Sequence, residues 1–167
     1  MLLYHGSNLT VEEPRLMEQT RGLDFGAGFY LTSRVKQAGE FSEDITHRRK
    51  QGIPTVSVYE FDEIAAEKTL DIAVFPEPNA EWLEFVRDNR LKIYSGKKYD
   101  IIVGPVANDR VYLALQALII GELSIEAALV VLKPYKLFDQ YCLATEKALL
   151  MLKFVKSIPF AGGKVND

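Results

Sequence analysis

Two short stretches, Leu2-Leu3-Tyr4-His5-Gly6-Ser7 and Phe25-Gly26-Ala27-Gly28-Phe29-Tyr30, decide how this sequence is interpreted. The apolar run at 2–5 predicts an opening strand, and residues 28–32 predict a second strand. The glycine after His5 leaves the backbone accessible at the end of the first strand. An imidazole, a backbone amide and a hydroxyl therefore meet there, and together they can bind the polar edge of a small planar ligand. Taken alone, this triplet is more typical of a structural element than of a binding site.

The glycine pair of the second stretch is not one of the common nucleotide-binding loops. It lacks the third glycine of the dinucleotide fingerprint, and it leads into a strand rather than a helix. It also lacks the Gly-Lys-Ser/Thr ending of a phosphate-binding loop. Because side chains alternate along a strand, Phe29 and Tyr30 are predicted to point to opposite faces. We therefore expect one ring in the core and the other on the wall of a pocket.

The sequence as a whole predicts a mixed α+β fold in one domain, residues 1–160, followed by a disordered tail, residues 161–167. Ser33 is predicted to be the N-cap of a helix that places four apolar residues on one face: Val35, Ala38, Phe41 and Ile45. Further strands are predicted at 55–61, 100–104, 138–143 and 151–157. Further helices are predicted to begin after the N-cap residues Asn79, Asp109 and Ser124, and a helical turn is predicted to begin at Thr145 and Glu146.

The composition argues against several classes of protein. The 167 residues carry a net charge of −3, so no general attraction to nucleic acid is expected. The one cysteine, Cys142, cannot form an internal disulfide, which suits the cytoplasm, and its apolar neighbours predict a buried, inert thiol. No signal peptide is expected, and the apolar runs are shorter than the roughly 20 residues of a membrane span. Two distant histidines and one cysteine predict no metal site.

Residues 5–7, residues 25–33 and a following helix with Gln37, Ala38 and Phe41 together resemble the NAD-binding core of ADP-ribosyltransferases. The similar branch contains diphtheria toxin and the poly(ADP-ribose) polymerases, and it has a His-Tyr-Glu triad. The resemblance implies a split antiparallel β core with flanking helices. It also implies that NAD is bound as a substrate, without a metal ion.

The resemblance assigns a role to each matching position. Gly6 would hold the nicotinamide carboxamide through its backbone, and Tyr30 would stack on the nicotinamide ring. His5 and Ser7 would contact the adjacent ribose, and Phe41 would close the other face of the ring. The implied cofactor-binding residues are His5, Gly6, Ser7, Gly28, Phe29, Tyr30 and Phe41.

The third triad position falls on Gln140, where the family has a glutamate. A glutamine keeps an oxygen that accepts a hydrogen bond from a ribose hydroxyl, but it has no charge and is not a general base. The implied catalytic residues are thus His5, Tyr30 and Gln140. The implied function is mono-ADP-ribosylation of an intracellular protein or nucleic acid. The alternative is a catalytically inactive module of this kind that binds NAD or a partner protein.

The resemblance extends to bacterial members of the superfamily that share the segments 82–90 and 99–109 and a glutamine in the late strand. Such proteins resemble small intracellular effectors, which implies a toxin held by an antitoxin protein. Arg90 and Asp109 are candidates for the rim of the implied pocket. Alternatively, Arg90 is a salt-bridge partner and Asp109 is only the N-cap of its helix. Trp82 and Phe85 are predicted to be core residues.

Overall fold

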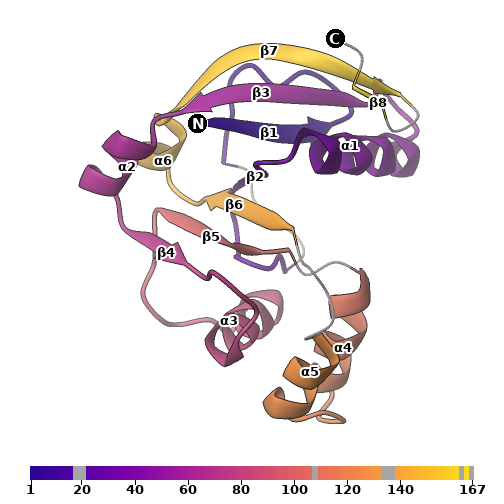
Figure 1. Ribbon diagram of the computed structural model, residues 1–167, viewed down its shortest axis with the longest axis vertical. Coiled ribbons are helices and arrows are strands. Elements are labelled where there is room, and N and C mark those ends of the chain that lie inside the picture. The colour runs from indigo at the N-terminus through magenta and orange to yellow at the C-terminus, as the bar shows by residue number, and fades with distance from the viewer. Residues whose placement is uncertain (17–21, 107–108, 133–137, 162–163, 166–167) are drawn as a thin grey trace.

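The computed structural model describes residues 1–16, 22–106, 109–132, 138–161 and 164–165, with only the main chain described at 109–110 and 164–165 (Figure 1). Two four-stranded sheets form its framework, with the strand orders β1-β3-β7-β8 and β2-β6-β5-β4. The first sheet contains β1 (Leu2–Ser7), β3 (Thr55–Phe61), β7 (Leu152–Ala161) and β8 (Lys164–Val165). The second contains β2 (Phe29–Leu31), β6 (Asp139–Leu143), β5 (Ile101–Pro105) and β4 (Ile72–Val74). Neighbouring strands are antiparallel except β4 and β5, which are parallel.

Helices cover the outer faces of both sheets and the end of the first (Figure 1). They are α1 (Val35–Arg49), α2 (Glu63–Thr69), α3 (Ala80–Arg90), α4 (Asp109–Ile119), α5 (Ile125–Leu132) and α6 (Glu146–Leu149). The fold is therefore α+β, as the sequence predicts. No helix in the described ranges has both the length and the apolar character that crossing a bilayer requires.

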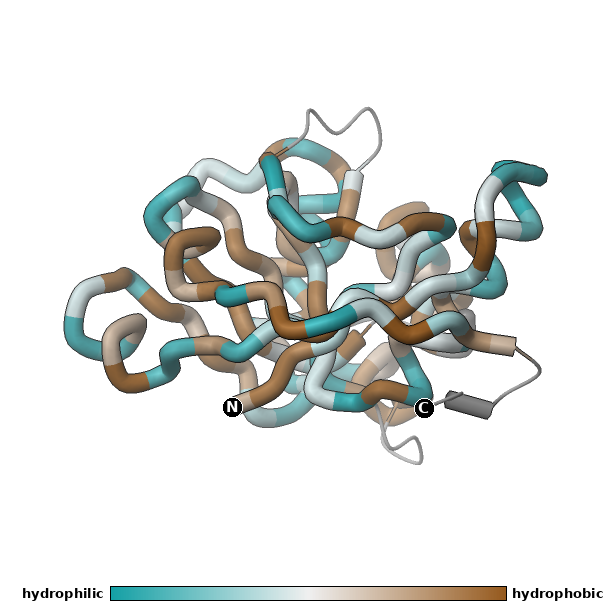
Figure 2. The backbone as a smooth tube through the Cα atoms, turned by 90° about the horizontal axis from the view of Figure 1, so that it is seen from above, coloured by the Kyte–Doolittle hydropathy of each residue, from teal (hydrophilic) through white to brown (hydrophobic). Residues whose placement is uncertain are grey.

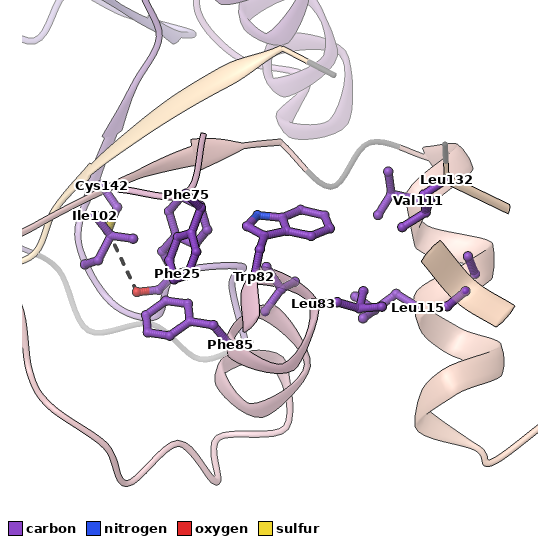
Figure 3. Packing of buried hydrophobic residues seen from close by; sticks show 13 residues of the cluster. Phe25, Phe75, Trp82, Leu83, Phe85, Ile102, Val111, Leu115, Leu132 and Cys142 are labelled. Carbon is purple, nitrogen blue, oxygen red and sulfur yellow. Dashed lines mark hydrogen bonds between the residues drawn. The ribbon is translucent and has the colours of Figure 1, made fainter. Parts of the chain in front are cut away.

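Three hydrophobic clusters lie between the layers, and Figure 2 shows hydrophobic stretches crossing the middle of the molecule. The first lies between α1 and the first sheet, and Phe160 is its largest member. The second lies between the two sheets, where Leu3 and Tyr59 meet Phe29. The third joins the other face of the second sheet to α3, α4 and α5, with the fully buried Trp82 between the aromatic rings and the α4–α5 pair (Figure 3). The prediction that Trp82 and Phe85 are core residues is confirmed.

Helix α1 approaches the first sheet so closely, at β1 and at β7, that only small residues of the helix fit at the contact. A Cβ atom added to Gly6 would lie 1.9 Å from the carbonyl oxygen of Ala38, and one added to Gly39 would lie 2.1 Å from the ring of Phe160. The buried residues of α1 are accordingly Ala38, Gly39 and Ser42. The predicted apolar face is therefore wrong at Phe41, whose side chain is 46% exposed.

The start of α1 also differs from the sequence prediction. Ser33 is not the N-cap residue, because Arg34 holds that position without a capping side-chain bond. The hydroxyl of Thr32 accepts the backbone N–H of Arg34 instead, at 3.2 Å. The cap predictions for Asn79 and Ser124 are confirmed, because their side chains each accept a backbone N–H three residues later. The helical turn predicted at Thr145 is also present, and the hydroxyl of Thr145 caps α6 by accepting the N–H of Ala148.

The C-terminal segment differs from the disordered tail that the sequence predicts from residue 161. Ala161 ends β7, and Lys164 pairs with it as part of β8. The physical reason lies just upstream, where the buried side chains of Ile158 and Phe160 anchor β7 against α1. Two further elements, α2 and β4, are not predicted from the sequence. Asp62 caps α2 by accepting the N–H of Ala65, a signal visible in the sequence, whereas the three-residue β4 depends on its distant partner β5.

Replacing Gly6 with alanine should lower the free energy of unfolding by about 3 kcal/mol or more, because the added methyl group meets a backbone carbonyl that cannot turn aside. Urea denaturation followed by circular dichroism measures this. Gly121→Ala is the matched control: Gly121 has a φ of +79° but nothing within 4 Å of an added Cβ, so only backbone strain of about 1–2 kcal/mol is expected. Equal losses in the two variants would contradict the close approach of α1 to β1.

Candidate functional site

The candidate site lies where β1 and β2 part. The two strands share a single bridge, in which Tyr4 and Thr32 exchange backbone hydrogen bonds of 2.9 and 3.0 Å. Continuing that antiparallel register would pair Gly6 with Tyr30. Instead, Nδ1 of His5 lies 2.7 Å from the carbonyl oxygen of Tyr30. A histidine side chain therefore takes the place of the next backbone rung.

This interruption leaves the main chain of Gly6 directed toward β2. In an antiparallel strand, the N–H and C=O groups of alternate residues point to opposite edges. The carbonyl of Met1 accepts from Phe61 on β3, whereas the groups of Tyr4 pair with Thr32 on the other edge. Gly6 has the same orientation as Tyr4. On that edge its N–H and C=O have no hydrogen-bond partner among the residues that the structure describes.

The surroundings of His5 fix its protonation. Because a carbonyl oxygen only accepts, Nδ1 must carry the hydrogen in the contact with Tyr30. Burial lowers the pKa of His5 below its ordinary value, and the hydrogen bond to Tyr30 opposes this only in part. The ring is also stacked on Phe29, with centroids 4.3 Å apart. The neutral imidazole thus presents Nε2 as a hydrogen-bond acceptor.

Tyr30 lies on the opposite face of β2 from Phe29, as strand alternation predicts. Its hydroxyl donates to the carbonyl of Gly26 at 2.7 Å and accepts the N–H of Phe25 at 3.2 Å. Burial raises the pKa of the phenol far above its ordinary value, and the contact with Cys142 adds to this effect, so the phenol is neutral. Tyr30 therefore holds the glycine turn in place while its ring packs beside the third cluster.

The two glycines of that turn are required by close packing and by backbone conformation. Gly26 has a φ of +79°, which favours glycine. A Cβ atom on Gly28 would lie 2.4 Å from Sγ of Cys142 and 2.8 Å from the carbonyl oxygen of Leu143. The turn can therefore lie directly against β6, which brings Tyr30 to the same face of the second sheet as Gln140.

Gln140 is buried and held by two acceptors. Its Nε2 donates to Oδ2 of Asp24 at 3.0 Å and to the carbonyl oxygen of Pro105 at 3.3 Å. Because the Asp24 carboxylate and the Pro105 carbonyl can only accept, the NH₂ group of the amide must face them. Oε1 of Gln140 therefore points away from both. Arg90 binds the other oxygen of Asp24, with Nη2 at 2.6 Å. The salt-bridge interpretation of Arg90 is thus confirmed.

Asp24 is a member of the site that sequence reasoning missed. It lies 116 positions from Gln140 and 66 from Arg90, so no local spacing connects it with either residue. The only signal is a single acidic residue directly before the Phe25-Gly26 turn. Its partners become visible only when β6 and the end of α3 are placed beside the turn.

The other predicted site residues are less closely connected. Ser7 ends β1 and is half-buried, whereas Phe41 is exposed and makes no ring contact within the described ranges. Asp109 is the first residue of α4, but its side chain lies outside the described part of the chain, so neither its rim nor its capping role can be placed. Cys142 is fully buried, as the sequence predicts, and burial raises the pKa of its thiol to about 12.

Two further observations concern ligands. Within the described ranges, no three His, Cys, Asp or Glu side chains are grouped so that they could hold a metal ion. A surface hollow of about 600 Å³ lies at the far end of the first sheet, between the β3–α2 and α6–β7 connections. It is lined by Met1, Glu60 and Met151 among others, and it contains none of the predicted site residues.

Comparison with known proteins gives one match. A family model described as "Protein of unknown function (DUF3990)" matches residues 1–154. No curated protein and no solved structure matches the chain.

Replacing Tyr30 with phenylalanine should lower the free energy of unfolding by about 1–3 kcal/mol, because the carbonyl of Gly26 and the N–H of Phe25 lose their partner. The matched control is Tyr141→Phe, because the hydroxyl of Tyr141 makes one exposed 3.9 Å contact with the sulfur of Met1 and no other hydrogen bond with the described residues. Urea denaturation should show a change within about 0.5 kcal/mol for that control. A Tyr30→Phe variant as stable as the control would show that the hydroxyl of Tyr30 does not stabilise the turn at Phe25 and Gly26.

The lowered pKa of His5 predicts a stability difference that depends on pH. Because folding lowers the pKa of His5, the unfolded chain takes up the His5 proton at a higher pH than the folded chain. Lowering the pH from above the pKa of the unfolded chain toward the pKa of the folded chain therefore favours unfolding. Between pH 7.5 and 5.5, wild type should therefore lose stability relative to His5→Gln, measured by urea titration at each pH. His47→Gln, at the exposed histidine of α1, is the control and should follow the wild-type curve. Parallel curves for wild type and His5→Gln would refute the buried neutral histidine.

Proposed function

We propose that this chain, which belongs to the DUF3990 family, binds NAD where β1 and β2 part and transfers its ADP-ribose to an acceptor macromolecule. One observation supports this above all. The N–H and C=O of Gly6 face the edge from which β2 has separated, beside a neutral His5 whose Nε2 accepts a hydrogen bond. The resemblance of residues 5–7 and 25–33 to the NAD-binding core of ADP-ribosyltransferases supports the same ligand.

The carboxamide of nicotinamide suits the edge of Gly6. A primary amide has one acceptor and two donors, so its oxygen can accept the N–H of Gly6 while its NH₂ group donates to the C=O. A hydroxyl of the attached ribose would donate to Nε2 of His5, and the half-buried hydroxyl of Ser7 lies at the same strand end. In this proposal the two sheets are the two parts of a split β core, with β1 and β2 at the junction.

The proposed reaction breaks the bond between C1′ of the ribose and the nicotinamide nitrogen. Nicotinamide leaves with the bonding electron pair and becomes neutral, and a nucleophile of the acceptor forms a bond to C1′ and releases its proton. Gln140 would contribute Oε1 as an acceptor for a ribose hydroxyl, but it supplies no negative charge to a developing cation. We therefore expect slow turnover, with an acceptor that provides its own nucleophile.

A second function, binding of NAD without transfer, is favoured by the same residue. Both amide hydrogens of Gln140 are used in bonds to Asp24 and Pro105, so the side chain can accept a hydrogen bond but can neither donate nor take up a proton. The acceptor molecule and an antitoxin partner remain predictions from the resemblance alone.

The shape of the proposed amide site predicts selectivity between two nearly identical small molecules. Nicotinamide should bind at least about tenfold more tightly than nicotinic acid, because a carboxylate has no hydrogen to donate to the carbonyl of Gly6. Calorimetric titration of the purified protein measures both. His5→Ala should weaken NAD binding by a similar factor, with His47→Ala as the matched control. Equal affinity for nicotinamide and its acid would overturn the site at Gly6.

Labelled NAD separates the two functions. Incubation with cell lysate should transfer label to a macromolecule and release nicotinamide with wild type, and both signals should fall with His5→Ala. Binding of NAD without label transfer or nicotinamide release would leave only the second function.

A further inference from the structure

We propose that Asp24 is a positioning residue that requires an amide at position 140 and fixes the direction in which that amide points. The ligand-related part of this inference rests on the proposed function. The selection of an amide rests only on contacts within the protein, so it can be tested without NAD.

Three groups surround the amide of Gln140 and its partner Asp24. Asp24 and Gln140 are each 8% exposed, and Nε2 lies 3.0 Å from Oδ2 of Asp24 and 3.3 Å from the carbonyl oxygen of Pro105. Arg90 binds Oδ1 of the same carboxylate through Nε at 2.7 Å and Nη2 at 2.6 Å. Asp24 is thus held from one side by a cation and presents its second oxygen to the amide.

A glutamate at position 140 would meet these groups unfavourably. Its carboxylate would face the carboxylate of Asp24 and the carbonyl of Pro105, all of them acceptors in a buried setting. Two like charges at this distance do not both stay ionised without a large cost. The glutamine at the position where the resembling family has glutamate therefore follows from the presence of Asp24.

The same contacts determine which amide atom is available to a ligand. Since both neighbours accept, rotating the amide would place Oε1 against two oxygens. Asp24 and Pro105 therefore keep Oε1 on the far side, where it serves as an acceptor. Trp82 donates its indole N–H to the same Pro105 carbonyl at 3.2 Å, which holds that oxygen in position.

Exchanging the two side chains tests the selection of an amide. The variant Asp24→Asn/Gln140→Glu keeps one amide, one carboxylate and the same net charge, and the asparagine amide introduced at position 24 can donate to the new carboxylate. Thermal unfolding is measured for wild type, both single variants and the double variant. Gln140→Glu should lower the melting temperature by about 5 °C or more. Asp24→Asn should destabilise wild type, because Arg90 loses its anion, but it should stabilise the Gln140→Glu background.

That reversal of sign is the decisive result. Gln51→Glu, at an exposed glutamine, provides the control, because Asp24→Asn should have the same effect with either residue at position 51. If Asp24→Asn destabilises both the wild-type and the Gln140→Glu background by similar amounts, the selection of an amide by Asp24 is wrong.

The positioning role is tested with NAD as the probe. Asp24→Ala removes one of the two acceptors of Nε2 of Gln140 and should reduce kcat for nicotinamide release at least about tenfold while KM changes less than about twofold. Asp24→Asn keeps an acceptor oxygen and should retain most of the turnover, although it loses the ion pair with Arg90. If the wild type binds NAD without turnover, the dissociation constant of NAD replaces kcat. Equal losses in the two variants would show that Asp24 acts only through its ion pair and would overturn the positioning role.

The results separate the inference from the proposed function. If wild type fails to bind NAD but the sign reversal is observed, the proposed function fails and the selection of an amide by Asp24 stands. If NAD is bound or turned over but the stability effects add, the proposed function stands and the inference fails.

Discussion

The hydrogen bond from His5 to the Tyr30 carbonyl determines how the two sheets are joined. A backbone rung at this point would continue the ladder from the Tyr4–Thr32 bridge and merge β1 and β2 into one sheet. Because a neutral imidazole occupies the place of that rung, the strands diverge and their side chains form the cluster between the sheets. The edge of Gly6 that faces β2 is left without a backbone partner among the described residues by this substitution of a side chain for a backbone group.

Around this junction, the fold uses glycine where backbone segments approach one another. The absence of a Cβ atom lets α1 approach Gly6 and lets β6 approach Gly28. Both sides of the junction between β1 and β2 are therefore fixed by main chain and not by long side chains. The polar groups that remain are few and mostly satisfied, with Tyr30, Asp24 and Gln140 each bound by at least two partners or by a cation. If the junction binds NAD as proposed, side chains held in this way before binding would lower the entropy cost of binding.

Local patterns in the sequence predicted the strands of the junction and most helix starts, because alternation and capping depend on residues a few positions apart. They failed where a distant segment decides the outcome. Phe41 is apolar and correctly spaced for a buried face, but the contact of α1 with Gly6 turns the small residues inward. Asp24 was missed for the same reason, since its partners belong to α3 and β6. The NAD site itself remains a prediction, carried by resemblance and by the orientation of Gly6.

Packing constrains Gly6 independently of the proposed NAD binding. Any descendant of this chain must keep a glycine there for α1 to pack against β1, whether or not it still binds a ligand. The exposed Phe41 is under no comparable packing constraint, and the half-buried Ser7 is under less. Within the family, persistence of the glycine therefore reports only a preserved fold. A relative that had lost the proposed NAD binding would therefore still be expected to keep Gly6 for packing alone.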